Sequence, residues 1–474
     1  MKRTLLLIAL FAGIVAHAQA QALRISGTWH GVMRLNSLEL NLVLHLDGDS
    51  TCTLDSPDQG AKGIAGIVKE LTAEKVDVQF PLLLASYTAE LKDGQLVGTF
   101  KQRGFSLPLS MQPGDLVRQR PQTPQPPFPY ETREVTIPVP PPPSAVSPVC
   151  CDPSSPVCCD TIATSPSHTL AATLTLPTTP LPTGEVRGGA PLCLLLVSGS
   201  GLQDRDETLF DHKPFAVIAD YLARHGIATL RYDDRGFGQS TGDASRCTTA
   251  DFADDAAACI QYLRSTPLLR GGDGGRLNVG ILGHSEGGSI AFMLAARKLA
   301  DFIVTLAAPG IKGDTLLVEQ TNALLRLNGQ TPSMTLRNMR FIMATQETNP
   351  WYQYFVEYDP AADIAATRCP VLALNGSLDS QVLPQSNLTA IRQLLNLSEY
   401  PDTLPFLSPL RSESVPQGRA REGMGVGFYK EYPGLNHLFQ HAQTGATTEY
   451  GTIEETISPE VLHDIVDWLQ NLDK

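Results

Sequence analysis

Between residues 23 and 111, hydrophobic and polar residues alternate with a period of two. The run LELNLVLHL places five leucines, from Leu38 to Leu46, on one side of an extended chain. The turn sequences Asp47-Gly48-Asp49 and Asp93-Gly94 follow such runs, and a helical period is almost absent. The segment is therefore predicted to be a small antiparallel β-domain, either a barrel or a sandwich, with a structural role. A role in recognising sugar or lipid is the alternative.

After a Pro-rich linker predicted at residues 112–132, apolar runs of strand length alternate with amphipathic stretches. In PFAVIADYLARHG, for example, Phe215, Ile218 and Leu222 share one helical face. For residues 133–474 this alternation predicts an α/β domain with a mostly parallel sheet of about eight strands, covered by helices on both faces. The predicted strands are REVTIPV, TLAATLTL, LCLLLVSG, IATLRYDD, LNVGILGH, FIVTLAAP, PVLALNG and GFYKEYPG.

Three segments interrupt this alternation. Residues 138–167, rich in Pro, Ser and Cys, and residues 404–427 are interpreted as surface insertions. Residues 311–367 are helix-prone and contain no strand pattern, so we predict a cap over the carboxyl ends of the strands. The cap contains aromatic residues that are candidates for an acyl or aromatic subsite, although a core contact is the expected role of most of them. They are Trp351, Tyr352, Tyr354, Phe355 and Tyr358.

The N-terminal residues have the pattern of a targeting sequence. A positive tip is followed by an apolar run from Leu5 to Val15 and by small residues that fit a cleavage site. The apolar run is too short to span a bilayer, which requires about 20 residues. Residues 1–20 are therefore predicted to be a secretory signal peptide, and the mature protein to be periplasmic or extracellular, with no membrane span.

The composition and net charge limit the classes of partner that are expected. The 474 residues, 42% of them hydrophobic, are enough for two domains. The net charge is −13, and loss of Lys2 and Arg3 with the signal peptide would make it −15, since −13 − 2 = −15. This acidic balance disfavours nucleic acid and anionic membranes as partners. The nine cysteines permit disulfides in an exported chain and leave at least one thiol unpaired; CCDPSSPVCC indicates local disulfides or free thiols rather than a metal site.

The pentapeptide GHSEG, residues 283–287, joins a predicted strand to a predicted helix. This G-x-S-x-G pattern in a strand–turn–helix context is typical of a nucleophilic serine, because only glycines allow the close chain approach that the sharp turn requires. Ser285 is therefore the candidate nucleophile. The simpler interpretation is a Gly-rich turn that packs a helix on a strand.

A serine nucleophile needs a base and an acid that orients the base. In this architecture they follow the serine in the order acid, then histidine. Asp379 comes directly after the predicted strand PVLALNG, and His437 follows GFYKEYPG, so we predict them to be the acid and the base. The rival residues, which are not placed directly after strands, are His441, His463, Asp359, Asp363 and Asp402.

The oxyanion of the tetrahedral intermediate requires two preorganised donors. The backbone N–H of Glu286 is the first candidate because it follows the nucleophile. The loop after LCLLLV provides the second, which we predict to be the N–H of Ser200. No metal-ligand spacing and no phosphate-binding loop is found in the sequence, and no cofactor is expected.

These motifs together resemble exported bacterial α/β-hydrolases of the serine aminopeptidase-like and acyl-esterase type. The resemblance is carried by VSGSGLQDRDETLFDHKPF, GILGHSEGGSIA, CPVLALNGSLDSQV and YPGLNHLFQHAQTGATTEYGTIEETISPEVL, while ISGTWHGVM resembles the small β-domain that often precedes such hydrolases. It implies an α/β-hydrolase fold with Ser285, Asp379 and His437 as the triad. The insertions at 138–167 and 404–427 depart from the pattern, and the second puts substrate access in doubt.

The sequence therefore predicts a serine hydrolase that cleaves small carboxylic esters through an acyl-enzyme. A serine aminopeptidase or acyl-peptide hydrolase acting on short peptides is the first alternative. An inactive binding protein that uses its β-domain is an alternative of another class.

Overall fold

The computed structural model describes residues 25–35, 38–47, 51–59, 61–140, 167–178, 191–269, 277–345, 349–401 and 427–472. The predicted signal peptide and most of the two predicted insertions lie outside these residues. The chain divides into two compact units, one of residues up to Gln119 with Leu209–Asp211, and one of residues 120–208 and 212–474.

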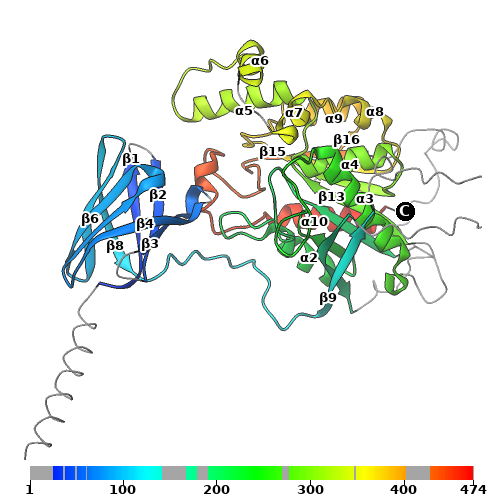
Figure 1. The fold of residues 1–474 in the computed structure, drawn as a ribbon. Helices are drawn as coiled ribbons and strands as arrows, with labels where there is room; N and C mark the ends of the chain where they lie inside the picture. Colours follow the sequence, from blue (N-terminus) through cyan, green and yellow to red (C-terminus); the bar gives the residue numbers. More distant parts are fainter. Residues whose placement is uncertain are drawn as a thin grey trace, which may run out of the picture. The chain divides into compact units, whose positions relative to one another are not determined.

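The first unit is an eight-stranded antiparallel barrel, in which β8 pairs back with β1 (Figure 1). The prediction of a small antiparallel β-domain is confirmed, and the structure selects the barrel. The strands are β1 (Gly27–Leu35), β2 (Leu38–Leu46), β3 (Thr51–Ser56), β4 (Ala61–Leu71), β5 (Lys75–Phe80), β6 (Ala85–Lys92), β7 (Gln95–Gln102) and β8 (Phe105–Pro113).

The two-residue period explains the barrel interior. Leu40, Leu42, Leu44 and Leu46 of β2 are all buried, as the alternation predicts for one face of a strand. The turn between β6 and β7 falls at Asp93-Gly94, where both residues have positive φ, 50° and 77°. Two such residues in sequence are typical of the tight turn that matches the twist of a β-hairpin.

The second unit contains a nine-stranded sheet in the order β16-β17-β15-β14-β13-β11-β12-β10-β9. All eight strands expected in this unit are present, and the two-residue β16 is an addition too short to show a period. The strands are β9 (Tyr130–Val139), β10 (His168–Pro177), β11 (Leu192–Val197), β12 (Ala228–Tyr232), β13 (Asn278–His284), β14 (Phe302–Leu306), β15 (Val371–Gly376), β16 (Ser398–Glu399) and β17 (Gly427–Tyr432).

The expectation of a mostly parallel sheet needs correction, because the sheet is mixed. Strand β10 runs antiparallel to both of its neighbours, β9 and β12, whereas the pairings from β12 to β16 are parallel. Parallel neighbours need a crossover, which is usually a helix. The segment between β9 and β10 is Pro-, Ser- and Cys-rich and has no helical pattern in sequence, so antiparallel pairing is the physically expected result.

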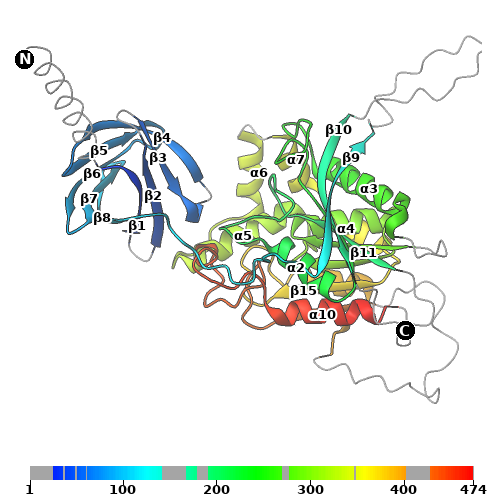
Figure 2. The same cartoon turned by 90° about the horizontal axis from the view of Figure 1, so that it is seen from below.

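Helices cover both faces of this sheet (Figures 1 and 2). Strand β11 shows how the two cores form, because Cys193, Leu195 and Val197 face one core while Leu194 and Leu196 face the other. The first core is covered by α3 (Thr249–Ser265), α4 (Glu286–Ala296), α8 (Ala361–Ala366) and α9 (Asn387–Leu395). The second is covered by α2 (Pro214–Arg224) and α10 (Pro459–Gln470).

The segment predicted as a cap is helical in its described part. It contains α5 (Gly313–Leu327), α6 (Leu336–Thr345), α7 (Pro350–Glu357) and α8, with no strand among its described residues. Helix α7 is capped by the side chain of Asn349, which accepts a hydrogen bond from the N–H of Tyr352 at 2.8 Å. Pro350 at the first helical position is equally typical of a helix start.

Two observations concern the cysteines and the helices of the described residues. Five cysteines lie in the described residues and all five are free thiols: Cys52, Cys193, Cys247, Cys259 and Cys369. The CCDPSSPVCC cysteines lie outside the described residues. Within the described ranges, no helix has the length and the apolar composition needed to cross a membrane.

Candidate active site

Ser285 occupies a strained turn between β13 and α4. Its backbone has φ 52° and ψ −119°, a conformation that non-glycine residues rarely adopt. The N–H of Ser285 donates to the carbonyl oxygen of Leu306 at 2.8 Å, which anchors the turn to β14. Such strain persists only where the surroundings enforce it, and it gathers at functional sites.

The two glycines of GHSEG are required by close packing. A Cβ on Gly283 would overlap the carbonyl oxygen of Gly287, and a Cβ on Gly287 would overlap the carbonyl oxygen of Val197 in β11. The helix α4 therefore approaches the sheet more closely than any residue with a side chain would permit. The glycines predicted from the motif thus have a specific steric reason.

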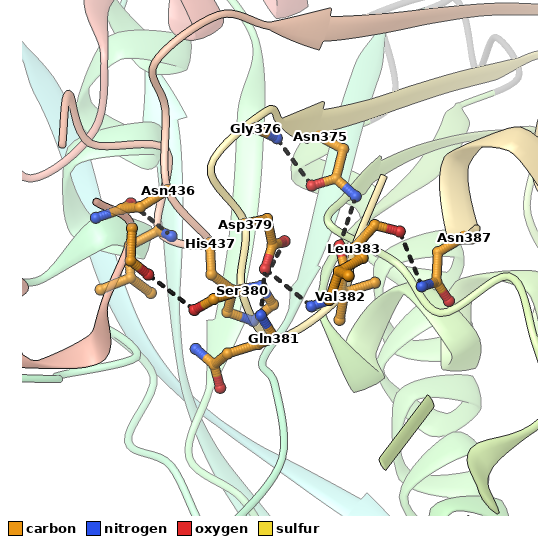
Figure 3. A network of polar contacts seen from close by, with 12 residues as sticks. Asn375, Gly376, Asp379, Ser380, Gln381, Val382, Leu383, Asn387, Asn436 and His437 are labelled. Atoms are coloured by element: carbon orange, nitrogen blue, oxygen red, sulfur yellow. Dashed lines mark hydrogen bonds and ion pairs between the residues drawn. The ribbon is translucent and has the colours of Figure 1, made fainter. Parts of the chain in front are cut away.

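The structure brings Asp379 and His437 together. Asp379 follows β15 and His437 follows β17, and His437 Nδ1 is 2.8 Å from Asp379 Oδ2. The other carboxylate oxygen, Oδ1, accepts hydrogen bonds from the N–H groups of Gln381 and Val382, both at 2.8 Å (Figure 3). The carboxylate is thus held by the turn after β15, and both side chains are buried.

The hydrogen bond to Asp379 determines the role left to the other ring nitrogen of His437. With Nδ1–H donated to a carboxylate, Nε2 is the nitrogen that would accept a proton. None of the described residues, Ser285 included, hydrogen-bonds to His437 Nε2. Hydrogen bonds between a nucleophile and its base are often long before substrate binds.

The turn that carries Ser285 lies beside His437. The residue before Ser285, His284, has its Nε2 atom 3.1 Å from the carbonyl oxygen of His437. The centroids of the two imidazole rings are 4.8 Å apart. The strand end that carries the candidate nucleophile and the loop that carries the candidate base are therefore in direct contact.

The loop after β11, residues 198–201, reaches the same place. A Cβ on Gly199 would lie 3.2 Å from the Cβ of Ser285. The N–H groups of Ser200 and of Glu286 donate to none of the described residues, and Glu286 is the first residue of α4, where helical N–H groups lack internal partners. Both predicted oxyanion donors thus come from elements that adjoin Ser285.

The side chain of Glu286 has a role that sequence reasoning missed. Its Oε1 atom accepts hydrogen bonds from Thr249 Oγ1 at 2.6 Å and from Trp351 Nε1 at 2.8 Å. Burial raises the pKa of this carboxyl. Since Trp351 belongs to α7, the bond ties the predicted cap to the first residue of α4. Any residue can occupy the x positions of G-x-S-x-G, so the motif does not predict this contact.

The aromatic residues of the predicted cap divide into two groups. Tyr354 and Tyr358 stack on each other and pack against the core beneath α3 and α4, as expected for most of the set. Trp351 stacks on Phe355 with ring centroids 5.3 Å apart while its indole N–H is donated to Glu286. Trp351 is therefore the aromatic residue of this set that is bound next to the serine turn.

A second buried acid lies next to the loop after β11, residues 198–201, which we call the oxyanion loop. Asp234 shares a cavity of about 10 Å³ with Glu286 and with residues 198 and 199. Burial, together with the neighbouring charge of Glu286, raises the pKa of Asp234 from 3.8 to about 8. The hydrogen bond that Asp234 accepts from the N–H of Gln203 at 2.8 Å opposes this shift. This carboxyl is thus largely protonated near neutral pH.

The rival residues have other partners. His441 is exposed and has its Nδ1 atom 2.9 Å from Glu455, and His463 lies on the exposed side of α10. Asp363 accepts a hydrogen bond from the Tyr358 hydroxyl, and Asp359 accepts one from the N–H of Ala361. Asp402 lies outside the described residues. Among the described residues, no group of three or more His, Cys, Asp or Glu side chains is arranged to hold a metal ion.

Comparison with known proteins shows which families part of this unit resembles. Residues 212–392 match the family described as serine aminopeptidase, S33; they include Ser285 and Asp379, whereas His437 lies beyond them. Esterase EstD of Thermotoga maritima is 26% identical over 219 residues, which cover 44% of this chain and 52% of that protein. The chain therefore spans about half the length of this curated relative.

The chain is also similar, at lower identity, to solved structures. Est1E from Butyrivibrio proteoclasticus with bound ferulic acid is 15% identical, covers 65% of this chain and 96% of its own, and has a TM-score of 0.40. The Pyrococcus furiosus esterase Pf2001 is 10% identical, covers 72% and 90%, and has a TM-score of 0.41. Similarity at this level says nothing about substrate. The match over residues 212–392 and the esterase relative support an α/β-hydrolase of the esterase type for the α/β part of this chain.

Proposed function

We propose that the α/β part of this protein is a serine esterase that hydrolyses small carboxylic esters through an acyl-enzyme. Ser285 Oγ attacks the acyl carbon while His437 Nε2 takes its proton. Asp379 holds the imidazole by its Nδ1–H and stabilises the imidazolium that forms. His437 then returns the proton to the leaving alcohol, and water releases the acyl group by the same steps.

The observation that carries this proposal is the hydrogen bond between Asp379 and His437. It orients the Nε2 atom of a buried histidine whose neighbour in space, His284, directly precedes a strained serine. The N–H groups of Glu286 and Ser200 are the proposed donors to the oxyanion, each contributing about 3 kcal/mol to transition-state stabilisation. Every step uses groups of this chain, so no cofactor is required.

Ester substrates are favoured over peptides by the state of Glu286. An aminopeptidase needs an acidic group to bind the free amine of its substrate. Glu286 is the acidic residue next to Ser285, but it is buried, and its carboxylate already accepts from Thr249 and Trp351. A peptidase remains the second candidate because the matched family is described as a serine aminopeptidase.

A panel of p-nitrophenyl esters tests the nucleophile and the reaction together. We expect wild type to hydrolyse the acetate or butyrate, and Ser285→Ala to lose activity by at least about 10⁴-fold. Ser289→Ala is the matched control, because the Ser289 hydroxyl is buried one turn further along α4 without a hydrogen-bond partner in the described structure. Equal activity of wild type and Ser285→Ala would refute the proposal.

Aminoacyl-nitroanilides, assayed in parallel, separate the two candidates. The esterase proposal predicts that kcat/KM for the esters exceeds that for the anilides. Cleavage of the anilides alone would make the protein a peptidase with the same nucleophile. A fluorophosphonate probe should label Ser285 in either case, and its failure to label the folded protein would favour an inactive binding protein.

A further inference from the structure

Glu207 occupies an unusual position between three parts of the candidate site. It lies in the loop after β11, is buried, and has a left-handed backbone with φ 52°. Its Oε1 atom accepts the N–H of Gly199 at 2.7 Å and lies 2.8 Å from His284 Nδ1. A charged side chain held in a strained, buried position requires specific partners, and these two adjoin Ser200 and Ser285.

The surroundings of His284 determine its protonation. Nδ1 faces the carboxylate of Glu207, and Nε2 faces the carbonyl oxygen of His437 at 3.1 Å. Both partners are acceptors, whereas a neutral imidazole has only one N–H to donate. A ring that satisfies both contacts must carry two protons and a positive charge.

We propose that Glu207 and His284 form a buried ion pair that positions the oxyanion loop and the His437 loop around Ser285. Glu207 holds the oxyanion loop through the Gly199 N–H, and His284 holds the loop after β17 through the carbonyl of His437. Neither residue reacts with substrate, so both are positioning residues. The chain of hydrogen bonds runs from Gly199 through Glu207 and His284 to His437.

The charges around His284 agree with this assignment. Burial opposes its positive charge, but the adjacent Glu207 carboxylate, the hydrogen bond to the His437 carbonyl and the more distant Asp379 together raise the pKa of His284. The His437 ring, 4.8 Å away, is the other titratable group that faces it. A buried His–carboxylate pair of this kind is kept when the hydrogen bonds satisfy both partners.

The ion pair has a pH-dependent consequence. A pKa raised in the folded state means that the pair is complete at low pH and is lost as the pH rises through that folded pKa. The neutral ring then has one N–H for two acceptors, so one of the two loops loses its tether. We therefore expect kcat/KM for an ester to fall on the alkaline side when His284 loses its proton.

Nitrogen NMR of the histidine side chains tests the charge directly and needs no activity. In the folded Ser285→Ala protein, the His284 ring should show two protonated nitrogens at pH 7. The signals of this ring are assigned to His284 by their absence when His284→Gln is added. A single protonated nitrogen at pH 7 would overturn the proposal. This measurement does not depend on the proposed function, so its failure is distinguishable from absence of esterase activity.

Kinetics test the positioning role, which rests on the proposed function. Glu207→Gln keeps the shape of the side chain but removes its charge, and should lower kcat by about 10- to 100-fold with a smaller change in KM. The alkaline limb of kcat/KM should move to lower pH, because His284 loses the anion that favours its protonated form.

His168→Gln is the matched control for a buried histidine–carboxylate pair. His168 Nε2 is 2.8 Å from Asp255 Oδ1, and neither residue hydrogen-bonds to Ser285, Asp379 or His437 within the described structure. Thermal unfolding compares the stability of the His168→Gln protein with that of the Glu207→Gln protein. The alkaline limb of kcat/KM in His168→Gln should match that of wild type. An alkaline limb unchanged in Glu207→Gln, or moved equally in both variants, would overturn the positioning role.

Discussion

The barrel and the carboxyl edge of the α/β sheet use polar residues in opposite ways. The buried polar side chains in the described part of the barrel include Ser56 and Asp58, and the Asp58 carboxylate is paired with Arg118. The non-glycine barrel residues with positive φ, Leu84, Asp93 and Arg103, adjoin or form turns. At the sheet edge, by contrast, His284, Glu286, Asp379 and His437 are all buried.

The comparison shows where this chain accepts energetically unfavourable features. Buried charges and strained backbones reduce stability unless other interactions hold them, so a region without a chemical role has no reason to collect them. The barrel follows the period-two rule almost throughout, whereas buried polar residues follow or end several strands of the sheet, among them β12, β13 and β15. Variants of the two regions should therefore differ in what they change.

The largest effect is expected from Asp379→Asn. An asparagine keeps the shape but removes the charge that orients and stabilises the His437 imidazolium, so kcat on a p-nitrophenyl ester should fall by about 10³- to 10⁴-fold. KM should change little, and circular dichroism should show a folded protein. An unchanged kcat in this variant would show that the buried carboxylate is not needed for catalysis, and it would contradict the comparison drawn between the two regions.

A second large effect concerns the pH dependence of stability. The pKa of Asp234 is raised from 3.8 to about 8, so the folded state binds its proton more tightly than the unfolded state between those values. The free energy of unfolding should therefore decrease as the pH rises from 5 to 8. In Asp234→Asn this decrease should be smaller by about 3–4 kcal/mol, since each pH unit between these pKa values corresponds to about 1.4 kcal/mol, and urea unfolding measures it. Parallel curves for the two proteins would contradict the assignment.

A smaller effect is expected where the predicted cap meets the serine turn. Trp351→Phe keeps an aromatic ring next to Phe355 but removes the N–H donated to the buried Glu286 carboxylate. We expect kcat/KM to fall by about 5- to 10-fold, since one hydrogen bond to a charged group contributes about 1–2 kcal/mol. Tyr352→Phe, one residue along α7, is the control and should retain wild-type activity.

The smallest effect on chemistry is expected in the barrel. The buried Tyr87 hydroxyl donates to the carbonyl oxygens of Leu96 and Leu109, at 3.1 and 3.2 Å. Tyr87→Phe should lower the free energy of barrel unfolding by about 1 kcal/mol and leave kcat unchanged. A loss of kcat here as large as that of Trp351→Phe would show that the barrel contributes to catalysis.

The elements of this fold were largely predictable because they depend on local patterns. Period two predicted the barrel strands, and apolar runs predicted eight strands of the sheet. The expectation of a mostly parallel sheet needed correction at β10, since strand direction depends on what connects and covers each strand. The serine turn was recognisable because its glycines are sterically required. The partners of the Glu207 and Glu286 side chains could not be named in advance, because those partners are distant in sequence.

The amino-acid sequence by itself determined the two-part organisation, the family resemblance and the candidates Ser285, Asp379 and His437, because each depends on spacing along the chain. Only the tertiary structure decided which polar groups meet. It placed His437 on Asp379, His284 between Glu207 and the His437 loop, and Trp351 on Glu286. These contacts join residues that are 58 to 153 positions apart, and distances of 2.8 to 3.1 Å at such separations arise only when strands and helices have packed.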